Sequence, residues 1–173
     1  MSIYLAIDTA STAIALALQT EDGAIRTRIL ESGADHSKVL LPAINELPGA
    51  ERSRLAGVAV VRGPGSYAGL RVGIATATGI AVALGVPLRG VSTLEAVADV
   101  AGGEGVLIHP AGRGEFAAQE WRDGRPVGPI LTLAPSELRG ERVAGEGAGA
   151  LGGIEIGPDA RCAAALRLAI PHQ

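Results

Sequence analysis

The chain has 173 residues, of which 47% are hydrophobic and 19% are charged. This length suits one domain or two small lobes, and the apolar content is sufficient for a folded core, which excludes a disordered chain. The net charge is −3, and Lys38 is the only lysine. Proteins that bind nucleic acid tightly gather basic residues on one face, so scattered arginines in an acidic chain argue against direct, tight nucleic-acid binding.

The sequence also bears on redox state and location. Cys162 is the only cysteine, so an intramolecular disulfide is excluded, and its place near the start of an expected helix indicates a packing residue. No basic leader precedes the first apolar run, so no signal peptide is expected. The uncharged stretch 72–88 reaches only the lower end of membrane-span lengths, and a buried helix followed by a strand explains it better. These features predict a cytoplasmic protein without a membrane span.

The beginning of the chain carries strand patterns. Short apolar or alternating runs lie at 3–7, 13–19 and 24–30. Glu21-Asp22-Gly23 is a turn sequence between the second and third runs, which predicts a hairpin. The chain is therefore expected to open with three antiparallel strands.

Helix and strand patterns alternate from there to about residue 101. A helix is expected at 35–47, where Asp35 is a suitable N-cap and Pro42 should kink or shorten the helix. The other expected elements are a strand at 58–61, a helix at 70–84 closed by Gly85, a strand at 86–91, and a helix from Ser92 to Ala101 with a capping box to Glu95. This order predicts an α/β fold of the ribonuclease-H-like plan, the building block of the actin-like ATPase superfamily.

A change of composition after Ala101 predicts a second lobe. Gly102, Gly103 and Gly105 suggest a hinge, so the expected lobes are 1–103 and 104–173. In the second lobe, strands are expected at 106–108 and 115–121, a turn at 122–125, and a helix at 161–169. This lobe resembles a shortened copy of the first.

Two segments have residue types that suit a nucleotide such as ATP or ADP. Asp8, Thr9 and Ser11 follow the first strand, where an acid and hydroxyls could lie under phosphates and orient the water shell of a metal. Gly63, Gly65 and Ser66 precede the long helix, whose N-terminus could cradle a phosphate. Plain turns held by side-chain hydrogen bonds would use the same residues, and no lysine follows these glycines as in a Walker A loop.

The long helix carries small residues at regular spacing. Gly69, Gly73, Ala77 and Ala81 recur every four residues, which lets another backbone approach closely. Such a stripe can pack inside the chain or against a partner, and the sequence leaves both alternatives open.

A set of motifs resembles the TsaB (YeaZ) family. The most specific segment is 60–73, from Val60-Val61-Arg62-Gly63 to Arg71-Val72-Gly73. It is accompanied by Ile7-Asp8-Thr9, by His36-Ser37, and by segments 85–88 and 90–95. The resemblance covers about residues 3–100, with weaker echoes at 113–115, 143–148 and 158–160. The chain departs from the family pattern at Pro110, where members often have an Asp, and in the missing tail.

The resemblance implies a non-catalytic role in making threonylcarbamoyladenosine beside the anticodon of tRNA. TsaB proteins bind and activate the catalytic subunit TsaD through a helical bundle, with the ATPase TsaE as a further partner, and no cofactor is required. The residues implied at the partner interface are His36, Leu40, Gly69, Leu70, Gly73, Ala77 and Ala81.

Two rival functions remain open at this stage. A small-molecule kinase or ATPase would use the two nucleotide-like segments, and a homodimer with a structural role would use the small-residue stripe. No catalytic residue is expected, because no nucleophile and base have a recognisable spacing. No metal site is expected either, because no two histidines lie four residues apart. His36 is interpreted as a surface or interface residue.

Overall fold

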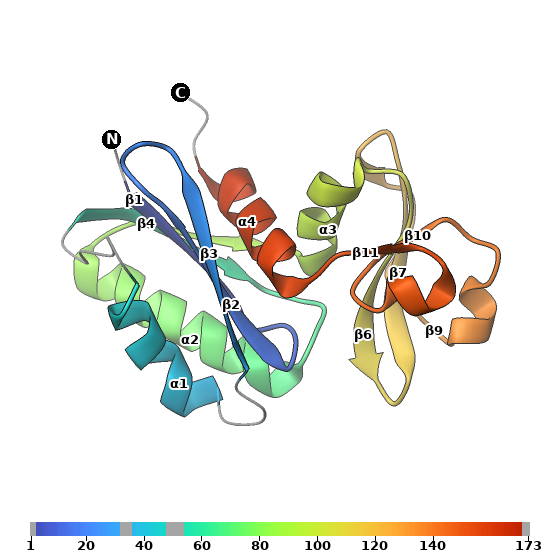
Figure 1. Ribbon diagram of the computed structural model, residues 1–173, viewed down its shortest axis with the longest axis horizontal. Coiled ribbons are helices and arrows are strands. Elements are labelled where there is room, and N and C mark those ends of the chain that lie inside the picture. Colours follow the sequence, from blue (N-terminus) through green and yellow to red (C-terminus); the bar gives the residue numbers. More distant parts are fainter. Residues whose placement is uncertain (1–2, 32–35, 48–53, 171–173) are drawn as a thin grey trace.

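The computed structural model describes residues 3–31, 36–47 and 54–170. Two sheets with their helices lie side by side (Figure 1). In chain order the first elements are β1 (Ile3–Asp8), β2 (Ala13–Gln19), β3 (Ile25–Glu31), α1 (His36–Asn45), β4 (Leu55–Val61), α2 (Tyr67–Leu84), β5 (Leu88–Val91) and α3 (Thr93–Ala101). The remaining elements are β6 (Gly105–Gly112), β7 (Glu115–Arg122), β8 (Arg125–Pro126), β9 (Leu131–Leu133), the 3₁₀ helices η2 (Pro135–Leu138) and η3 (Ala148–Leu151), β10 (Val143–Gly145), β11 (Ile154–Glu155) and α4 (Pro158–Ala169).

The first sheet has the strand order β3-β2-β1-β4-β5. β2 is antiparallel to both β1 and β3, whereas β4 is parallel to both β1 and β5. Helices α1 and α2 cover one face, where Leu5, Ile7 and Leu16 pack against Leu40 and Ile44 of α1. The predicted opening of three antiparallel strands, followed by alternating helices and strands, is confirmed.

Local signals in the sequence place the helix ends. Ser66 caps α2 by accepting a hydrogen bond from the amide of Gly69, and Gly85 ends the helix in the left-handed conformation with φ of 65°. Ser92 and Glu95 form the predicted capping box of α3. α1 ends at Asn45, soon after Pro42, while the predicted cap Asp35 lies outside the described residues.

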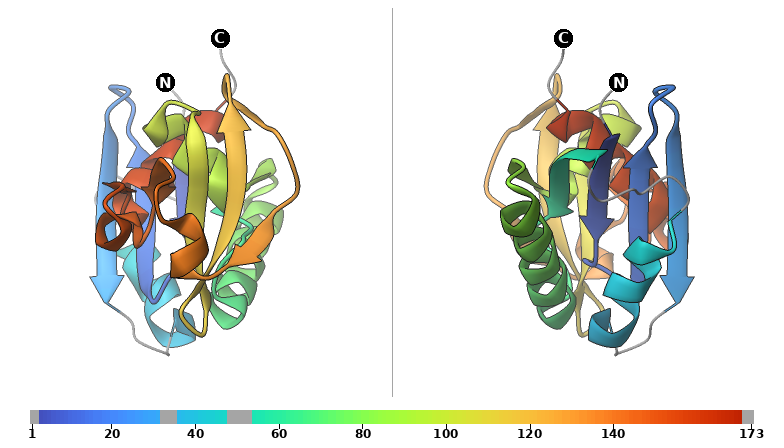
Figure 2. Two further views of the ribbon diagram at one scale, coloured as in Figure 1. Left: turned by 90° about the vertical axis from the view of Figure 1, so that its right-hand side faces the viewer. Right: turned by 90° about the vertical axis from the view of Figure 1, so that its left-hand side faces the viewer.

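The last helix returns to the first sheet. α4 packs on the face opposite α1 and α2 (Figures 1 and 2). Its Cys162, Ala165 and Leu166 share a core with Ala6 of β1 and Ala17 of β2. The division into lobes 1–103 and 104–173 stays a prediction; residue 103 lies between the two sheets, and α4 packs on the first sheet, which is distant from it in sequence.

The second sheet repeats the strand arrangement of the first. Its order is β11-β10-β6-β7-β8, with β9 also paired to β7. β6 and β7 are antiparallel, as β1 and β2 are, and β10 and β11 continue in parallel, as β4 and β5 do. Short 3₁₀ helices stand between its later strands, and α3 packs on β6 and β10, where Leu94 and Val97 share a core with Leu107.

Helix α2 is long and apolar enough to cross a membrane by length and composition, with a mean hydropathy of 1.4 over 18 residues. One of its faces packs on β4 and on the turn after β1. Its ends carry ordinary caps. α2 is therefore better explained as a helix that covers the sheet.

Candidate functional site

The turn after β1 brings Asp8, Thr9 and Ser11 into the interior between the lobes. The exposed fraction of the side chain is 0% for Asp8 and Thr9 and 6% for Ser11. One carboxylate oxygen of Asp8 accepts a hydrogen bond of 2.9 Å from the amide of Ala10. The side-chain to backbone bond expected of a plain turn is thus present.

The other carboxylate oxygen of Asp8 is bound by an arginine from the last helix. Arg161 of α4 donates from Nε to Asp8 Oδ2 at 2.6 Å, from Nη2 to Ser11 Oγ at 2.7 Å, and from Nη1 to Glu146 Oε2 at 2.7 Å. Ser11 also donates to Glu146. Arg161 is fully buried, so these charge-assisted bonds replace its hydration.

His109 of β6 completes the cluster. Its Nδ1 lies 3.2 Å from Arg161 Nη1, and its Nε2 lies 3.2 Å from the carbonyl oxygen of Ala10. Because a guanidinium can only donate, Nδ1 accepts and Nε2–H donates, which defines a neutral imidazole. Burial lowers the pKa of His109, and the neighbouring charge of Arg161 lowers it further.

Asp8, Ser11, His109, Glu146 and Arg161 are called the Arg161 cluster below. Burial alone would raise the pKa of Glu146, but the hydrogen bonds from Arg161 and Ser11 outweigh it and lower that pKa. Burial disfavours the charged form of Arg161, yet Asp8 and Glu146 raise its pKa overall. The cluster therefore contains two carboxylates, one guanidinium and a neutral histidine, and it joins both sheets and α4.

The loop before α2 packs directly on this turn. The amide of Ser66 donates to the carbonyl oxygen of Ala10 at 2.7 Å. Gly65 has φ of 158°, and a Cβ there would lie 2.6 Å from the same oxygen, so only glycine fits this close approach. The two segments that the sequence suggested for a nucleotide, the turn after β1 and the loop before α2, therefore lie side by side. They contact each other through Ala10. The carboxylate of Asp8 is already bound by Arg161, so a hydrated metal could use it only by displacing that side chain.

Thr9 shows how closely α2 approaches the turn. Its buried hydroxyl has no hydrogen-bond partner, and a Cβ on Gly73 would overlap it. A Cβ on Gly69 would overlap the carbonyl oxygen of Thr9. The small residues thus permit an internal contact.

The stripe predicted for a partner is therefore inside the chain. Gly69, Gly73, Ala77 and Ala81 are the buried residues of α2. His36 and Leu40 are buried too, at 7% and 1% exposed, and Leu70 packs against the α4 side of the sheet. A partner interface through these residues stays a prediction, and His36, interpreted from the sequence as a surface or interface residue, is buried within the chain. The imidazole of His36 lies 3.2 Å from the carbonyl oxygen of Ser11, so it supports the turn.

The outward side of α1 and α2 has a different composition. Its residues enclose a shallow hollow of about 320 Å³, and we call them the α1–α2 patch: Leu41, Thr76, Gly79, Ile80, Ala83 and Leu84. Leu41 is 45% exposed, and nothing lies within 4 Å of the position that a Cβ on Gly79 would occupy. An exposed glycine beside apolar side chains on a packed helix leaves room for a partner helix.

Within the described residues, no group of three or more His, Cys, Asp or Glu side chains is placed to hold a metal ion. Cys162 is fully buried, and burial raises the pKa of its thiol. Its sulfur contacts the carbonyl oxygens of Ala6 and Ala15. The interpretation of Cys162 as a packing residue agrees with these contacts.

Residues 30–137 match the family described as TsaD: tRNA N6-adenosine threonylcarbamoyltransferase. The chain belongs to this family. It is 36% identical over 97 residues to the tRNA threonylcarbamoyladenosine biosynthesis protein TsaB of Bacillus subtilis, covering 54% of this chain and 42% of that protein. It is 32% identical over 154 residues to an uncharacterized protein of Mycobacterium tuberculosis, covering 86% and 73% of the two chains. This TsaD-family chain spans about two fifths of the length of the first curated relatives it matches, 39% and 42%.

Solved structures agree with the sequence matches. YeaZ from Pseudomonas aeruginosa superimposes with a TM-score of 0.74 at 25% identity, over 98% of this chain and 92% of that one. The ethanolamine utilization protein EutJ from Carboxydothermus hydrogenoformans, at 14% identity and a TM-score of 0.51, shares the fold alone. The resemblance to the TsaB (YeaZ) family and the ribonuclease-H-like, actin-like fold are both confirmed.

Sequence reasoning missed the centre of the Arg161 cluster. Glu146 lies in a segment that echoes the family, and Arg161 was placed at the start of the last helix, but neither was predicted to contact Asp8. A buried arginine in an otherwise alanine-rich helix, 158–169, is the one signal that could have prompted the question.

Proposed function

We propose that this chain is a non-catalytic scaffold that binds and activates TsaD in the threonylcarbamoyladenosine modification of tRNA. The observation that carries this proposal is the buried ion pair between Arg161 and Asp8. The carboxylate that an actin-like enzyme would offer to a metal–nucleotide complex is neutralised by the chain's own guanidinium, whereas the α1–α2 patch remains open to a protein.

The same observation weakens the kinase or ATPase alternative. Two carboxylates of the cluster hydrogen-bond to one arginine, and His109 is neutral with both ring nitrogens engaged. A base for phosphoryl transfer would have to be released from these bonds. ATP or ADP binding at this turn stays a prediction, and it requires displacement of Arg161.

The partner contact that we propose is the α1–α2 patch, on the outward side of the two helices. It does not include the small-residue stripe of α2, which faces the interior of the chain. TsaD is the proposed occupant, and TsaE is a further partner in the same reaction. A homodimer through the same patch would compete with TsaD for it. Tight binding of tRNA by this chain alone is not part of the proposal, because its charge is negative overall.

Enlargement of Gly79 tests this assignment without disturbing the core. Gly79→Leu places a side chain in open space on the monomer, where a leucine also favours the helix over glycine. In a contact between helices the same side chain should cost about 1–3 kcal/mol through overpacking. We expect the affinity for TsaD, measured by titration calorimetry, to fall at least about tenfold.

Thr78→Leu is the matched control, because Thr78 is exposed on the same helix but lies outside the patch. It should leave the affinity for TsaD unchanged. Equal affinities of the two variants and the wild type would show that TsaD binds elsewhere. Loss of self-association in Gly79→Leu with unchanged TsaD affinity would assign the patch to a homodimer.

A further inference from the structure

The first sheet has an open edge at β5. In the strand order β3-β2-β1-β4-β5, β5 is hydrogen-bonded only to β4. Leu88 is 36% exposed, and Arg89 and Gly90 are exposed as well. An uncovered edge of this kind presents main-chain groups to which another strand can bind.

The main-chain groups at this edge alternate in direction. The carbonyl oxygens of Pro87 and Val91 accept hydrogen bonds from Val58 and Arg62, on the β4 side. In a parallel ladder alternate residues face the same neighbour. Leu88 and Gly90 therefore point their N–H and C=O groups away from β4, toward the open side.

Two arginines flank the edge, one on each face of the sheet. Arg89 pairs in register with Ala59, which faces α4. The stem of Arg62 lies over Gly90 on the other face, and a Cβ on Gly90 would be 3.0 Å from its Cδ. Neither guanidinium forms an ion pair or hydrogen bond with another part of the chain that the structure describes.

The opposite edge of the sheet differs in this respect. On β3, Arg28 is paired with Glu46. The pKa of Asp22 is lowered mainly by hydrogen bonds with Thr20 and Ala24, and the nearby positive charge of Arg26 lowers it further.

Two carboxylates, Glu95 and Asp99, line the cavity beside Arg89, but Glu95 accepts a bond from the Ser92 amide and Asp99 pairs with Arg167. The guanidinium groups of Arg62 and Arg89 therefore remain without an ion-pair partner in the part of the chain that the structure describes.

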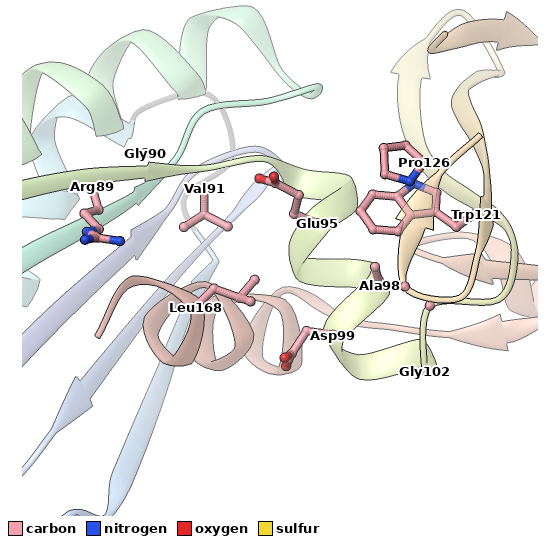
Figure 3. A pocket seen from close by; sticks show the side chains of 12 residues that line it. Arg89, Gly90, Val91, Glu95, Ala98, Asp99, Gly102, Trp121, Pro126 and Leu168 are labelled. Carbon is pink, nitrogen blue, oxygen red and sulfur yellow. The ribbon is translucent and has the colours of Figure 1, made fainter. Parts of the chain in front are cut away.

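Space is available beside β5. A cavity of about 640 Å³ is lined by Arg89, Gly90 and Val91 on one side and by Trp121 and Pro126 of the second lobe on the other (Figure 3). Its volume is in the range of binding pockets of about 300–1,000 Å³. An extended segment on the β5 edge would therefore have room to continue toward the second lobe.

We propose that β5 is a docking edge for an extended acidic segment of a partner protein, which adds to the first sheet as a sixth strand. Main-chain bonds to Leu88 and Gly90 hold the segment, as in other cases of strand addition. Carboxylates on it pair with Arg62 and Arg89. Successive side chains of a strand point to opposite faces, so two adjacent acidic residues reach both guanidinium groups.

The probe for this proposal is a fluorescently labelled, valine- and threonine-rich peptide with two adjacent aspartates at its centre. Its counterpart has two lysines there. We expect the aspartate peptide to bind the wild-type chain at least about tenfold more tightly than the lysine peptide. The double variant Arg62→Gln/Arg89→Gln should lose that binding by a similar factor, whereas Arg26→Gln at the opposite edge should not.

Amide hydrogen exchange distinguishes strand addition from simple charge attraction. At saturating peptide, the amides of Leu88 and Gly90 should become protected. Equal binding of the two peptides, no binding of the aspartate peptide, or binding without protection of these amides would overturn the proposal. Protection of the same amides at high protein concentration without peptide would also overturn it, because a second copy of this chain would then occupy the edge.

Discussion

The Arg161 cluster and the α1–α2 patch differ in burial: the cluster holds buried polar groups, and the patch holds exposed apolar groups. In the cluster, a fully buried guanidinium has a hydrogen-bond partner for each of its nitrogen atoms. In the patch, apolar side chains and Gly79 are left in contact with solvent. The first region is completed by the chain itself, while the second is exposed in the part of the chain that the structure describes.

This difference indicates where the chain meets other molecules. A cluster whose carboxylates are bound from within would have to release them before it could hold a metal–nucleotide complex. Exposed apolar patches mark sites of interaction, because covering them with another surface removes apolar area from water and favours binding. The comparison therefore favours partner binding at the α1–α2 patch over catalysis at the Arg161 cluster. The following predictions test the role assigned to each region.

The largest effect is expected from removal of the central charge. Arg161→Met leaves the buried Asp8 and the half-buried Glu146 without their counterion, and loss of a buried counterion typically costs about 3–5 kcal/mol. Urea denaturation should show this loss of unfolding free energy. Arg167→Met, which breaks the exposed pair with Asp99, should change it by less than about 1 kcal/mol. Similar losses in the two variants would contradict the structural role of the cluster.

A smaller effect separates the two faces of α2. Gly73→Ala places a methyl group against the Thr9 hydroxyl and should destabilise the chain by about 1–3 kcal/mol. Gly79→Ala meets no neighbour and should stabilise it by about 0.5–1 kcal/mol through helix propensity. Thermal melts of the two variants should therefore shift in opposite directions. A shift of the same sign in both would mean that the faces of α2 are assigned wrongly.

The pH dependence should follow from the depressed pKa of His109. The unfolded chain takes up a proton near the ordinary value of 6.5, whereas the buried neutral imidazole does not, so stability falls as the pH drops below that value. Glu146, whose pKa is also lowered, adds a further loss below its ordinary value of 4.5. Urea denaturation at pH 7.5 and at pH 5.5 should differ by about 1 kcal/mol. His109→Gln should remove most of that difference, and an unchanged pH dependence would speak against a neutral His109.

Much of the fold could be predicted because its signals are local. The capping box at Ser92 and Glu95, the turn at Asp22-Gly23 and the αL glycine at position 85 each specify an element boundary within a few residues. The spacing of small residues on α2 was also visible. The spacing could not show which part of the chain these small residues approach. In the structure, Gly69 and Gly73 lie against Thr9.

The site was less predictable because its contacts cross the whole chain. Arg161 and Asp8 are separated by 153 positions, and no periodicity or motif links such residues. Asp8, Thr9 and Ser11 were singled out from the sequence as candidates for nucleotide binding, which stays a prediction. Their partner became evident only when α4 was placed on the first sheet.

The most direct test of the central claim is the modification of tRNA by TsaD in the presence of two variants of this chain. Gly79→Leu alters the patch and leaves the cleft intact, while Glu146→Gln alters the cleft and leaves the patch intact. Both are first checked to remain folded at the assay temperature. The account predicts that Gly79→Leu reduces the stimulation of TsaD at least about tenfold and that Glu146→Gln retains it. Full stimulation by Gly79→Leu with loss in the folded Glu146→Gln would contradict the account and return the function to the cleft.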